Sequence, residues 1–307
     1  MIISIDGGTT NTRIALVDNG GVIDRVKISV GARDNAADFK KILGEEIKRL
    51  LKKNKVEKRE ISFVTASGMI TSDAGLLNVT HITAPAGRTE LSQSKKEMFF
   101  DEIFHLPITF IPGVKVLGEN TLDIDIMRGE ETEVMGLFAY DIKPPFTAVL
   151  PGSHTKIVNV NSEGKIETFC TCMSGELIRA VSENTIISRS LNGIFPKKAD
   201  VEMLKTGYEY AKKNGFNSAV FKVRILDLFN EEVSPEKLYS FLLGAVLQND
   251  IERVLRTSDK TVVIAGSDPF RSAYEALLKD TDKKVITLKD DIAENLAAIG
   301  AYKIMVQ

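Results

Sequence analysis

Apolar and polar positions alternate in blocks over the first thirty residues, and this pattern predicts three consecutive strands. Ile2 to Ile5 is mostly apolar, apolar residues return from Arg13 to Asp18, and Val22 to Val30 follows the turn Asn19-Gly20-Gly21. Between the first two strands lies the segment IDGGTTNTR, residues 5–13, in which glycine, threonine and asparagine replace apolar residues. The break therefore predicts a hairpin whose tip is rich in hydrogen-bond donors.

The pattern changes to a helical period over residues 36–54, where the apolar positions recur on one side and lysines occupy the other. Two apolar runs that end in loops, ISFVTASGM (61–69) and ITFIPGVKV (108–116), predict buried strands. A weaker helical pattern spans 89–104, and Glu130 to Tyr140 predicts a second helix. The basic run KRLLKKNKVEKR contains an acidic residue and overlaps the first helix, so we interpret it as a solvated helix face.

The opening pattern returns after Pro144-Pro145, a pair of residues that indicates a boundary. FTAVLPGSHTKIVNVNSEGKIETFCT (146–171) predicts strand, polar turn, strand, turn and strand, so that it resembles the first thirty residues in element order. The elements expected beyond it are helices over 175–188, 235–257, 271–279 and 292–305 and strands over 261–267 and 284–288. We therefore expect an α/β chain with duplicated halves, residues 1–143 and 144–307, around a central cleft.

Length and composition agree with two globular domains and argue against some classes of binding partner. The chain has 307 residues and a net charge of -2, which gives no reason to expect nucleic acid or an anionic membrane as a partner. Its two cysteines, Cys170 and Cys172, are next-but-one neighbours and more typical of a packed strand than of a metal site or a secreted disulfide framework. No leader or membrane-spanning run is evident, so we expect a cytoplasmic protein, and the sequence is compatible with a homodimer.

Two donor-rich turns carry the candidate chemistry. The first presents Gly7, Gly8, Thr9, Thr10 and Asn11, and the second, LPGSHTK, presents Gly152, Ser153, His154, Thr155 and Lys156 at the matching place. Glycines let a backbone approach an anion closely, and the polar side chains add donors, so the pair predicts a grip on polyphosphate. Asp6 ends the first strand, where a hydrated Mg²⁺ bridging phosphates needs a carboxylate. Gly266 and Ser267 follow a later strand, a suitable place for an adenosine ring.

The constellation resembles the actin, hexokinase and Hsp70 ATPase superfamily, which has a ribonuclease H-like fold in two duplicated domains. IDGGTTNTRIALVD, IPGVKV, DIMRGEETEVMG, LPGSHTKIVNV and FCTCMSGEL are similar, in order and spacing, to the 2-dehydro-3-deoxygalactonokinases of D-galactonate breakdown. The resemblance covers residues 2 to about 300. It implies ATP-dependent phosphorylation of the 6-hydroxyl of 2-dehydro-3-deoxy-D-galactonate, with ATP and Mg²⁺ as cofactors.

The resemblance also suggests roles for individual residues. In related sugar kinases an aspartate at the start of the helix before the boundary takes the hydroxyl proton, but that position is Gly129 here. Asp125 is our first choice for the catalytic base and Glu130 our second. Arg128 suits the substrate carboxylate, because a guanidinium binds a carboxylate in bidentate fashion. The substrate side is further expected to include Ser67, Gly68 and Met69.

The sequence departs from the family at two tryptophan positions, which hold Gly7 and approximately Leu76, so another 2-keto-3-deoxy sugar acid stays open as the substrate. Two alternatives to the sugar-acid kinase remain. One is a different enzyme of the superfamily, such as a pantothenate kinase or a phosphatase. The other is a non-catalytic regulator that binds nucleotide or sugar.

Overall fold

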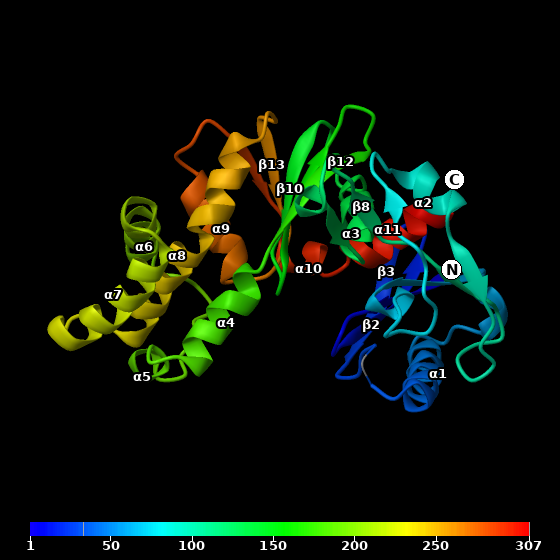
Figure 1. The fold of residues 1–307 in the computed structure, drawn as a ribbon. Helices are drawn as coiled ribbons and strands as arrows, with labels where there is room; N and C mark the ends of the chain where they lie inside the picture. The colour runs from blue at the N-terminus through cyan, green and yellow to red at the C-terminus, as the bar shows by residue number, and fades with distance from the viewer. Residues whose placement is uncertain (33, 307) are drawn as a thin grey trace. The chain divides into compact units, whose positions relative to one another are not determined.

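The computed structural model describes residues 1–32 and 34–306, which form two compact units (Figure 1). Unit 1 contains Met1–Pro144, Asn161–Thr168 and the segment from Glu294 onward, and unit 2 contains Pro145–Val160 and Phe169–Ala293. The first division lies next to the boundary expected from the sequence. The segments 161–168 and 294 onward, however, group with the N-terminal part of the chain.

Unit 1 is built on a six-stranded sheet with the order β3-β2-β1-β4-β7-β6. β1 pairs antiparallel with β2 and parallel with β4. The apolar face of α1 supplies Phe39, Leu43 and Ile47 to the same core cluster as Ile3 and Ile5 of β1. A second sheet, ordered β5-β8-β9, completes the unit. The elements are β1 (Ile2–Gly7), β2 (Thr12–Asp18), β3 (Gly21–Ile28), α1 (Ala36–Lys53), β4 (Phe63–Gly68), β5 (Ile82–Thr83), α2 (Arg88–Gln93), β6 (Lys96–Met98), β7 (Ile108–Phe110), β8 (Val114–Val116), β9 (Asp125–Met127), α3 (Glu130–Leu137) and α11 (Leu296–Met305).

Unit 2 is built on a five-stranded sheet with the order β12-β11-β10-β13-β14, in which β12 belongs to the unit from Phe169 onward. β10 pairs antiparallel with β11 and parallel with β13. The long helix α8 lies beside α6 and α7 (Figure 1) and contributes many of the buried residues of the unit's core. The elements are β10 (Phe146–Leu150), β11 (Thr155–Val160), β12 (Ile166–Cys172), α4 (Ser174–Asn184), α5 (Ser188–Leu191), α6 (Val201–Asn214), α7 (Phe216–Phe229), α8 (Pro235–Arg256), β13 (Thr261–Ile264), α9 (Phe270–Leu278), β14 (Lys284–Thr287) and α10 (Asp290–Ala293).

The two sheets share one topology. In each, three consecutive strands lie side by side, and the first of them pairs parallel with a strand that follows an intervening helix. The hairpin after the first strand therefore lies at the carboxyl end of a central strand in both units. This agrees with the internal repeat expected from the sequence.

Several elements differ from the expectation: α6 and α7 were not among the expected helices, the helix expected over 175–188 ends at Asn184, and three further segments take another form. In the segment 89–104 the helix α2 is short and strand β6 follows it. The strand forms because residues 96–98 pair with β7 at the edge of the sheet. The run 108–116 is divided between two sheets around Gly113, where an added Cβ would lie 2.4 Å from the Met127 carbonyl oxygen. The closing helix 292–305 is interrupted, and its second part, α11, packs on α3 through Gly136 and Gly300.

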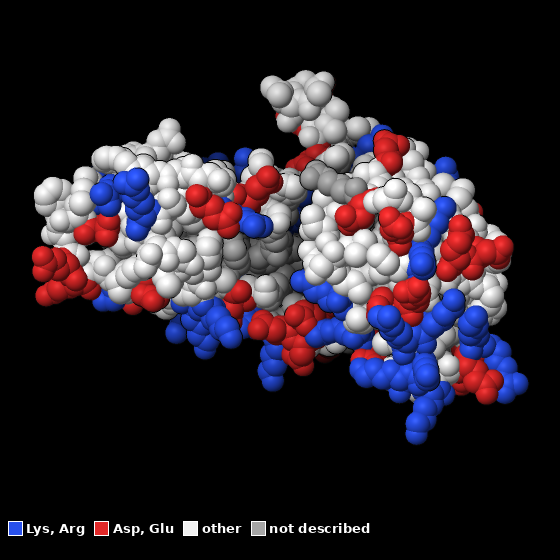
Figure 2. All heavy atoms as spheres, turned by 90° about the horizontal axis from the view of Figure 1, so that it is seen from below, with Lys and Arg blue, Asp and Glu red and all other residues white. Residues whose placement is uncertain are grey.

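The lysine-rich face of α1 is exposed and ion-paired in places. Figure 2 shows lysine and arginine side chains gathered on the right of that view, with acidic side chains among them. Arg49 pairs with Glu46 at 2.5 Å and Lys53 with Asp24 at 2.7 Å. These contacts are those of a solvated helix face.

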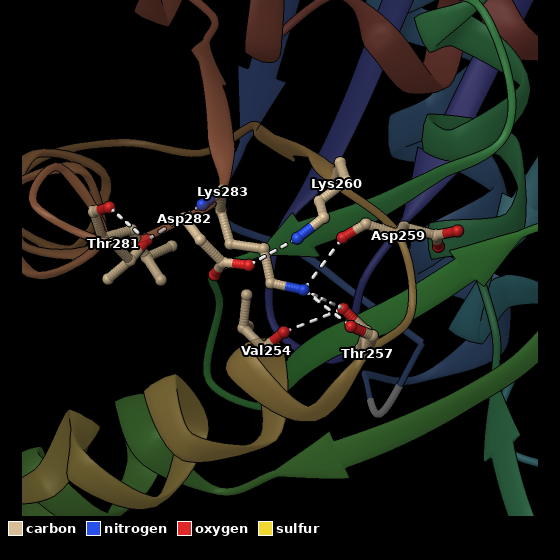
Figure 3. Close-up of polar contacts among 8 residues, drawn as sticks. Val254, Thr257, Asp259, Lys260, Thr281, Asp282 and Lys283 are labelled. Carbon is tan, nitrogen blue, oxygen red and sulfur yellow. Dashed lines mark hydrogen bonds and ion pairs between the residues drawn. The ribbon is translucent and has the colours of Figure 1, made fainter.

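Polar contacts fix the amino end of the unit 2 sheet (Figure 3). The buried Lys283 ammonium donates to the carbonyl oxygens of Thr257 at 2.6 Å and Asp259 at 2.9 Å, beyond the end of α8. Lys260 pairs with Asp282 at 2.6 Å. These contacts stabilise the amino end of the sheet, and the candidate segments of unit 2 lie at its opposite end, after β10 and β13. Within the described residues, no helix is both long and apolar enough for a membrane span.

Candidate functional site

The first donor-rich turn forms a tight hairpin, here called hairpin 1 (residues 7–12). The Gly8 N–H donates to the Asn11 carbonyl at 2.9 Å, and a Cβ on Gly8 would lie 2.9 Å from that same oxygen. Thr10 is exposed, and its hydroxyl accepts a hydrogen bond from the Asn11 amide at 3.0 Å. Gly31 supports the tip from below, since its Cβ would lie 2.5 Å from Thr9 and Thr10 backbone atoms. The tip is thus a compact backbone turn with polar side chains at the surface.

Asp6 lies at the base of hairpin 1, in a cradle made by glycines. Its side chain is 18% exposed, and Oδ2 accepts from Arg13 at 3.0 Å across the β1–β2 pair. A Cβ on Gly68 would lie 3.1 Å from Oδ1 of Asp6, and one on Gly129 would lie 4.0 Å from it. Burial raises the pKa of Asp6, and Arg13 opposes this shift. The glycines therefore keep open the space beside one carboxylate oxygen.

The end of β4 brings the predicted substrate segment beside Asp6. β1 and β4 are parallel neighbours, and Ser67 pairs in register with Asp6 and Gly68 with Gly7. The Ser67 hydroxyl is buried and has no hydrogen-bond partner among the residues that the structure describes. Met69, partly buried, begins the short turn that follows. An unpartnered buried hydroxyl is unusual in a folded protein, and this one lies beside Asp6, so it is a candidate for bonding a ligand or water.

The acidic start of α3 lies against the same cradle. Gly129 begins the helix with φ +116°, a conformation that favours glycine. Both carboxylate oxygens of the fully buried Glu131 accept from the Gly129 N–H, at 2.9 and 2.8 Å, and burial raises its pKa well above the ordinary value. Glu131 is therefore committed to the helix start.

Glu133 is a candidate site residue that the sequence pattern did not indicate. Its pKa is raised to about 8, first by burial and then by the charges of Asp6 and Glu130, while Arg13 lowers it. The negative charge of Asp6 therefore disfavours ionisation of Glu133. The only signal in the sequence was its position three residues after Glu130, on the same helix face.

Arg128 is engaged by the protein itself. Its Nη1 donates to the Thr71 carbonyl and hydroxyl, both at 2.6 Å, and its Nη2 donates to the Val79 carbonyl at 2.9 Å. Nη2 also lies 3.2 Å from Nδ1 of His81, whose pKa is lowered to about 4 by burial, Arg128 and Lys115. Arg128 thus ties β9 to the loop after β4, and its contact with substrate stays a prediction.

The two candidate bases lie on either side of Arg128. Asp125 begins β9 opposite Val116, and its Oδ1 accepts from the Ile126 N–H at 2.7 Å. Glu130 is the first residue of α3, and its Oε2 accepts from the Arg128 N–H at 3.1 Å. Of the two, only Glu130 contributes to the raised pKa of Glu133.

The second donor-rich turn, here called hairpin 2 (residues 150–156), is held by the start of α4. A Cβ on Gly175 would lie 2.1 Å from the Gly152 carbonyl oxygen, and the Glu176 N–H donates to the Ser153 carbonyl at 3.0 Å. His154 lies 2.7 Å from the Glu176 carboxylate. Gly152, Ser153 and His154 are exposed, whereas Thr155 and Lys156 are buried. The exposed turn next to a helix N-terminus suits an anion.

The expected adenosine segment adjoins hairpin 2. Gly266 follows β13, and its Cβ would lie 2.8 Å from Cδ of Pro151. Ser267 leads into α9, where its carbonyl accepts from the Arg271 N–H at 3.1 Å. In unit 2 the structure therefore brings together hairpin 2, the start of α4 and Gly266. In unit 1 it brings together hairpin 1, Asp6 and the ends of β4 and α3.

Comparison with known proteins gives one family. A family model described as 2-keto-3-deoxy-galactonokinase matches residues 6–304. A probable 2-dehydro-3-deoxygalactonokinase of Rhizobium meliloti strain 1021 is 36% identical over 67 residues, a match that spans 22% of this chain and 22% of that relative.

Solved structures confirm the actin-like fold. A Sinorhizobium meliloti protein named for the same 2-dehydro-3-deoxygalactonokinase activity superposes with a TM-score of 0.81 at 19% identity, over 99% of this chain and 98% of that one. The activator of 2-hydroxyisocaproyl-CoA dehydratase from Clostridium difficile, solved with bound ADPNP, gives 0.53 at 13% identity over 99% and 94%.

Proposed function

We propose that this chain, which belongs to the 2-keto-3-deoxy-galactonokinase family, transfers the γ-phosphate of ATP to the 6-hydroxyl of 2-dehydro-3-deoxy-D-galactonate. The observation that carries the proposal is the family match over residues 6–304. The geometry supports it, because each unit presents a donor-rich hairpin at the carboxyl end of its central strand. Phosphoryl transfer relies on positioned phosphates and neutralised charge, with little covalent work by the protein.

The residues at Asp6 fit a hydrated magnesium ion. Gly68 and Gly129 leave open the space beside Oδ1 of Asp6, a space that side chains would fill. Mg²⁺ usually keeps several waters and takes one or two carboxylates besides nucleotide phosphates. Asp6 would hold the ion through water, and Arg13 would keep Asp6 oriented. When bound, the ion would neutralise charge on the β- and γ-phosphates.

Hairpin 1 and hairpin 2 are proposed to bind the phosphates through backbone N–H groups and the polar side chains at their tips. Gly266 and Ser267 would contact the adenosine. Lys156 is proposed to neutralise charge that develops in the transition state. Its side chain is buried on β11, so any approach to phosphate would take place at the base of hairpin 2.

The proton acceptor is proposed to be a carboxylate of unit 1. Asp125 and Glu130 follow from the sequence, and Glu133 is added by the structure. A general base works best when its pKa lies near the working pH, and Glu133, at about 8, has such a pKa.

Ser67, Gly68 and Met69 are proposed to lie on the substrate side. The unpartnered Ser67 hydroxyl has a hydrogen bond to offer to a sugar-acid oxygen. Gly7 has no room for the family's tryptophan, because a Cβ there would lie 2.6 Å from Cβ of Ile70. The contacts with the sugar chain are therefore expected to differ from those of tryptophan-containing members.

A coupled assay of ATP consumption tests the function. The purified protein is supplied with Mg²⁺, ATP and a panel of 2-keto-3-deoxy sugar acids of different length and stereochemistry. Turnover with 2-dehydro-3-deoxy-D-galactonate, and a 6-phosphorylated product identified by mass spectrometry and NMR, supports the proposal. Absence of ATP consumption with every acid in the panel contradicts it.

A further inference from the structure

A buried carboxylate lies in the mainly apolar core of unit 2. Asp250, on α8, is 2% exposed, and its neighbours on the helix belong to the unit's main apolar cluster. Its Oδ2 accepts from the hydroxyl of Ser174 and from the hydroxyl of Tyr274. The Cys172 thiol is a third donor to this carboxyl group. Burial raises the pKa of Asp250, and these donors oppose the shift.

The donors come from elements that meet at hairpin 2. Ser174 is the first residue of α4, Cys172 ends β12, and Tyr274 lies on α9. The residue after Ser174 is Gly175, whose Cα faces the Gly152 carbonyl so closely that a Cβ there would lie 2.1 Å from the oxygen. Asp250 is therefore linked to the hairpin backbone through the hydrogen bond from Ser174 and the close contact between Gly175 and Gly152.

The outer side of this turn of α4 is not covered by other elements of the described chain. A groove of about 490 Å³ adjoins it, lined by residues 171–174 and Leu177, by Phe216 of α7 and by residues of α8 that include Asp250. Met173 is 57% exposed and Leu177 is 37% exposed. Ile178, one turn further on, packs in the core, and the Ser174 hydrogen bond adds directional support at the start of the helix.

We propose that Asp250 is a positioning residue for nucleotide binding, acting through Ser174 and Gly175 to fix the backbone of hairpin 2. The inference rests on the proposed function only in the assumption that hairpin 2 binds phosphate. Asp250 itself is buried in the core and contacts no substrate in this role. Loss of the anchor leaves unit 2 folded but lets hairpin 2 shift, and displacement of a positioning element by about 1 Å can cost about a hundredfold in rate.

The test compares variants that alter the anchor with one that does not. Asp250→Asn keeps the side-chain shape, Ser174→Ala removes one donor, and Ser174→Thr restores a hydroxyl. The matched control is Ser240→Ala, on the same helix. The buried Ser240 hydroxyl accepts from the Asp200 N–H at 2.9 Å and so supports the start of α6 instead of hairpin 2.

Two readouts separate positioning from general destabilisation. In Asp250→Asn and Ser174→Ala, hydrogen exchange of the intact protein is expected to speed up at residues 150–156 and 173–177. In Ser174→Thr it is expected to return toward the wild-type rate. In the control Ser240→Ala it is expected to stay unchanged at these residues. The KM for ATP is expected to rise about tenfold while the KM for the sugar acid changes less than about twofold. Equal changes in both KM values, or unchanged exchange at hairpin 2, would overturn the proposal.

Tyr274→Phe covers the case in which Asp250→Asn does not fold, because it removes one hydroxyl and keeps the aromatic ring. It is expected to give the same exchange pattern, and wild-type exchange at hairpin 2 in Tyr274→Phe and Ser174→Ala contradicts the anchor. If the wild-type protein shows no turnover, the proposed function fails, but the exchange result still decides whether Asp250 fixes the hairpin.

Discussion

The substitution Glu133→Gln is expected to stabilise the protein and at the same time to reduce its activity. The pKa of Glu133 is raised from 4.5 to about 8 because burial and the charges of Asp6 and Glu130 disfavour its ionised form. Between these two values the unfolded chain releases the proton and the folded chain keeps it. The unfolded state therefore binds fewer protons, and the free energy of unfolding falls as pH rises through this range.

The size of the effect follows from the shift. At 1.36 kcal/mol per pKa unit the ceiling is about 5 kcal/mol, and water around this partly buried side chain reduces the expected value to about 1–3 kcal/mol. Glutamine removes this pH-dependent cost, so the variant is expected to gain stability relative to wild type above pH 4.5, with the full gain reached near pH 8. If Glu133 accepts the substrate proton, turnover falls by about a hundredfold or more.

Denaturant unfolding at pH 5, 6, 7 and 8, with a chelator present, measures the stability difference, and the coupled assay measures turnover. Glu45→Gln, at an exposed position of α1, makes the same chemical change and is expected to follow wild type at every pH. A stability difference between Glu133→Gln and wild type that does not change with pH refutes the electrostatic reasoning. Unchanged turnover would exclude Glu133 as the base while leaving the stability argument intact.

Three further predictions concern the proposed site. Asp6→Asn is expected to weaken the dependence of turnover on Mg²⁺ concentration and to lower turnover at least about a hundredfold, measured by Mg²⁺ titration; wild-type Mg²⁺ dependence would contradict the metal role. Asp125→Asn is expected to lower turnover about a hundredfold while ATP binding, measured by calorimetry, persists, and retained turnover would move the role to Glu130 or Glu133. Gly175→Ala is expected to cost about 1–3 kcal/mol of stability and to raise the KM for ATP. The control Gly244→Ala, whose Cβ would lie 1.9 Å from the Leu204 carbonyl oxygen, is expected to lose stability without that KM change, and equal KM effects would contradict the explanation.

Much of the fold was predictable because local patterns and tertiary structure agree in it. The helix expected over 36–54 is α1, Ala36–Lys53, and the helix expected over 235–257 is α8, Pro235–Arg256. The helix α1 has clear apolar periodicity, α8 has a long apolar run, and both have side-chain N-caps, at Asn35 and Ser234. By contrast, β6 lies in a stretch with a weak helical pattern, and only its pairing with β7 makes it a strand. Such a strand pairing depends on residues outside the segment itself, so the local pattern does not predict it.

The same distinction explains the candidate site. Hairpin 1 and hairpin 2 were predictable because glycine and polar residues within a few positions specify a turn. The electrostatic role of Glu133 depends on Asp6, more than a hundred residues earlier, and the contacts of Arg128 depend on Thr71 and Val79. A local sequence pattern cannot report that a carboxylate is buried beside another carboxylate, or that a guanidinium is already used by backbone carbonyls. For this reason the sequence indicated only that Arg128 suits a carboxylate. In the structure Arg128 holds the loop that leads away from Ser67 and Gly68. Replacing Arg128 is therefore expected to disturb the substrate side even without a direct contact with substrate.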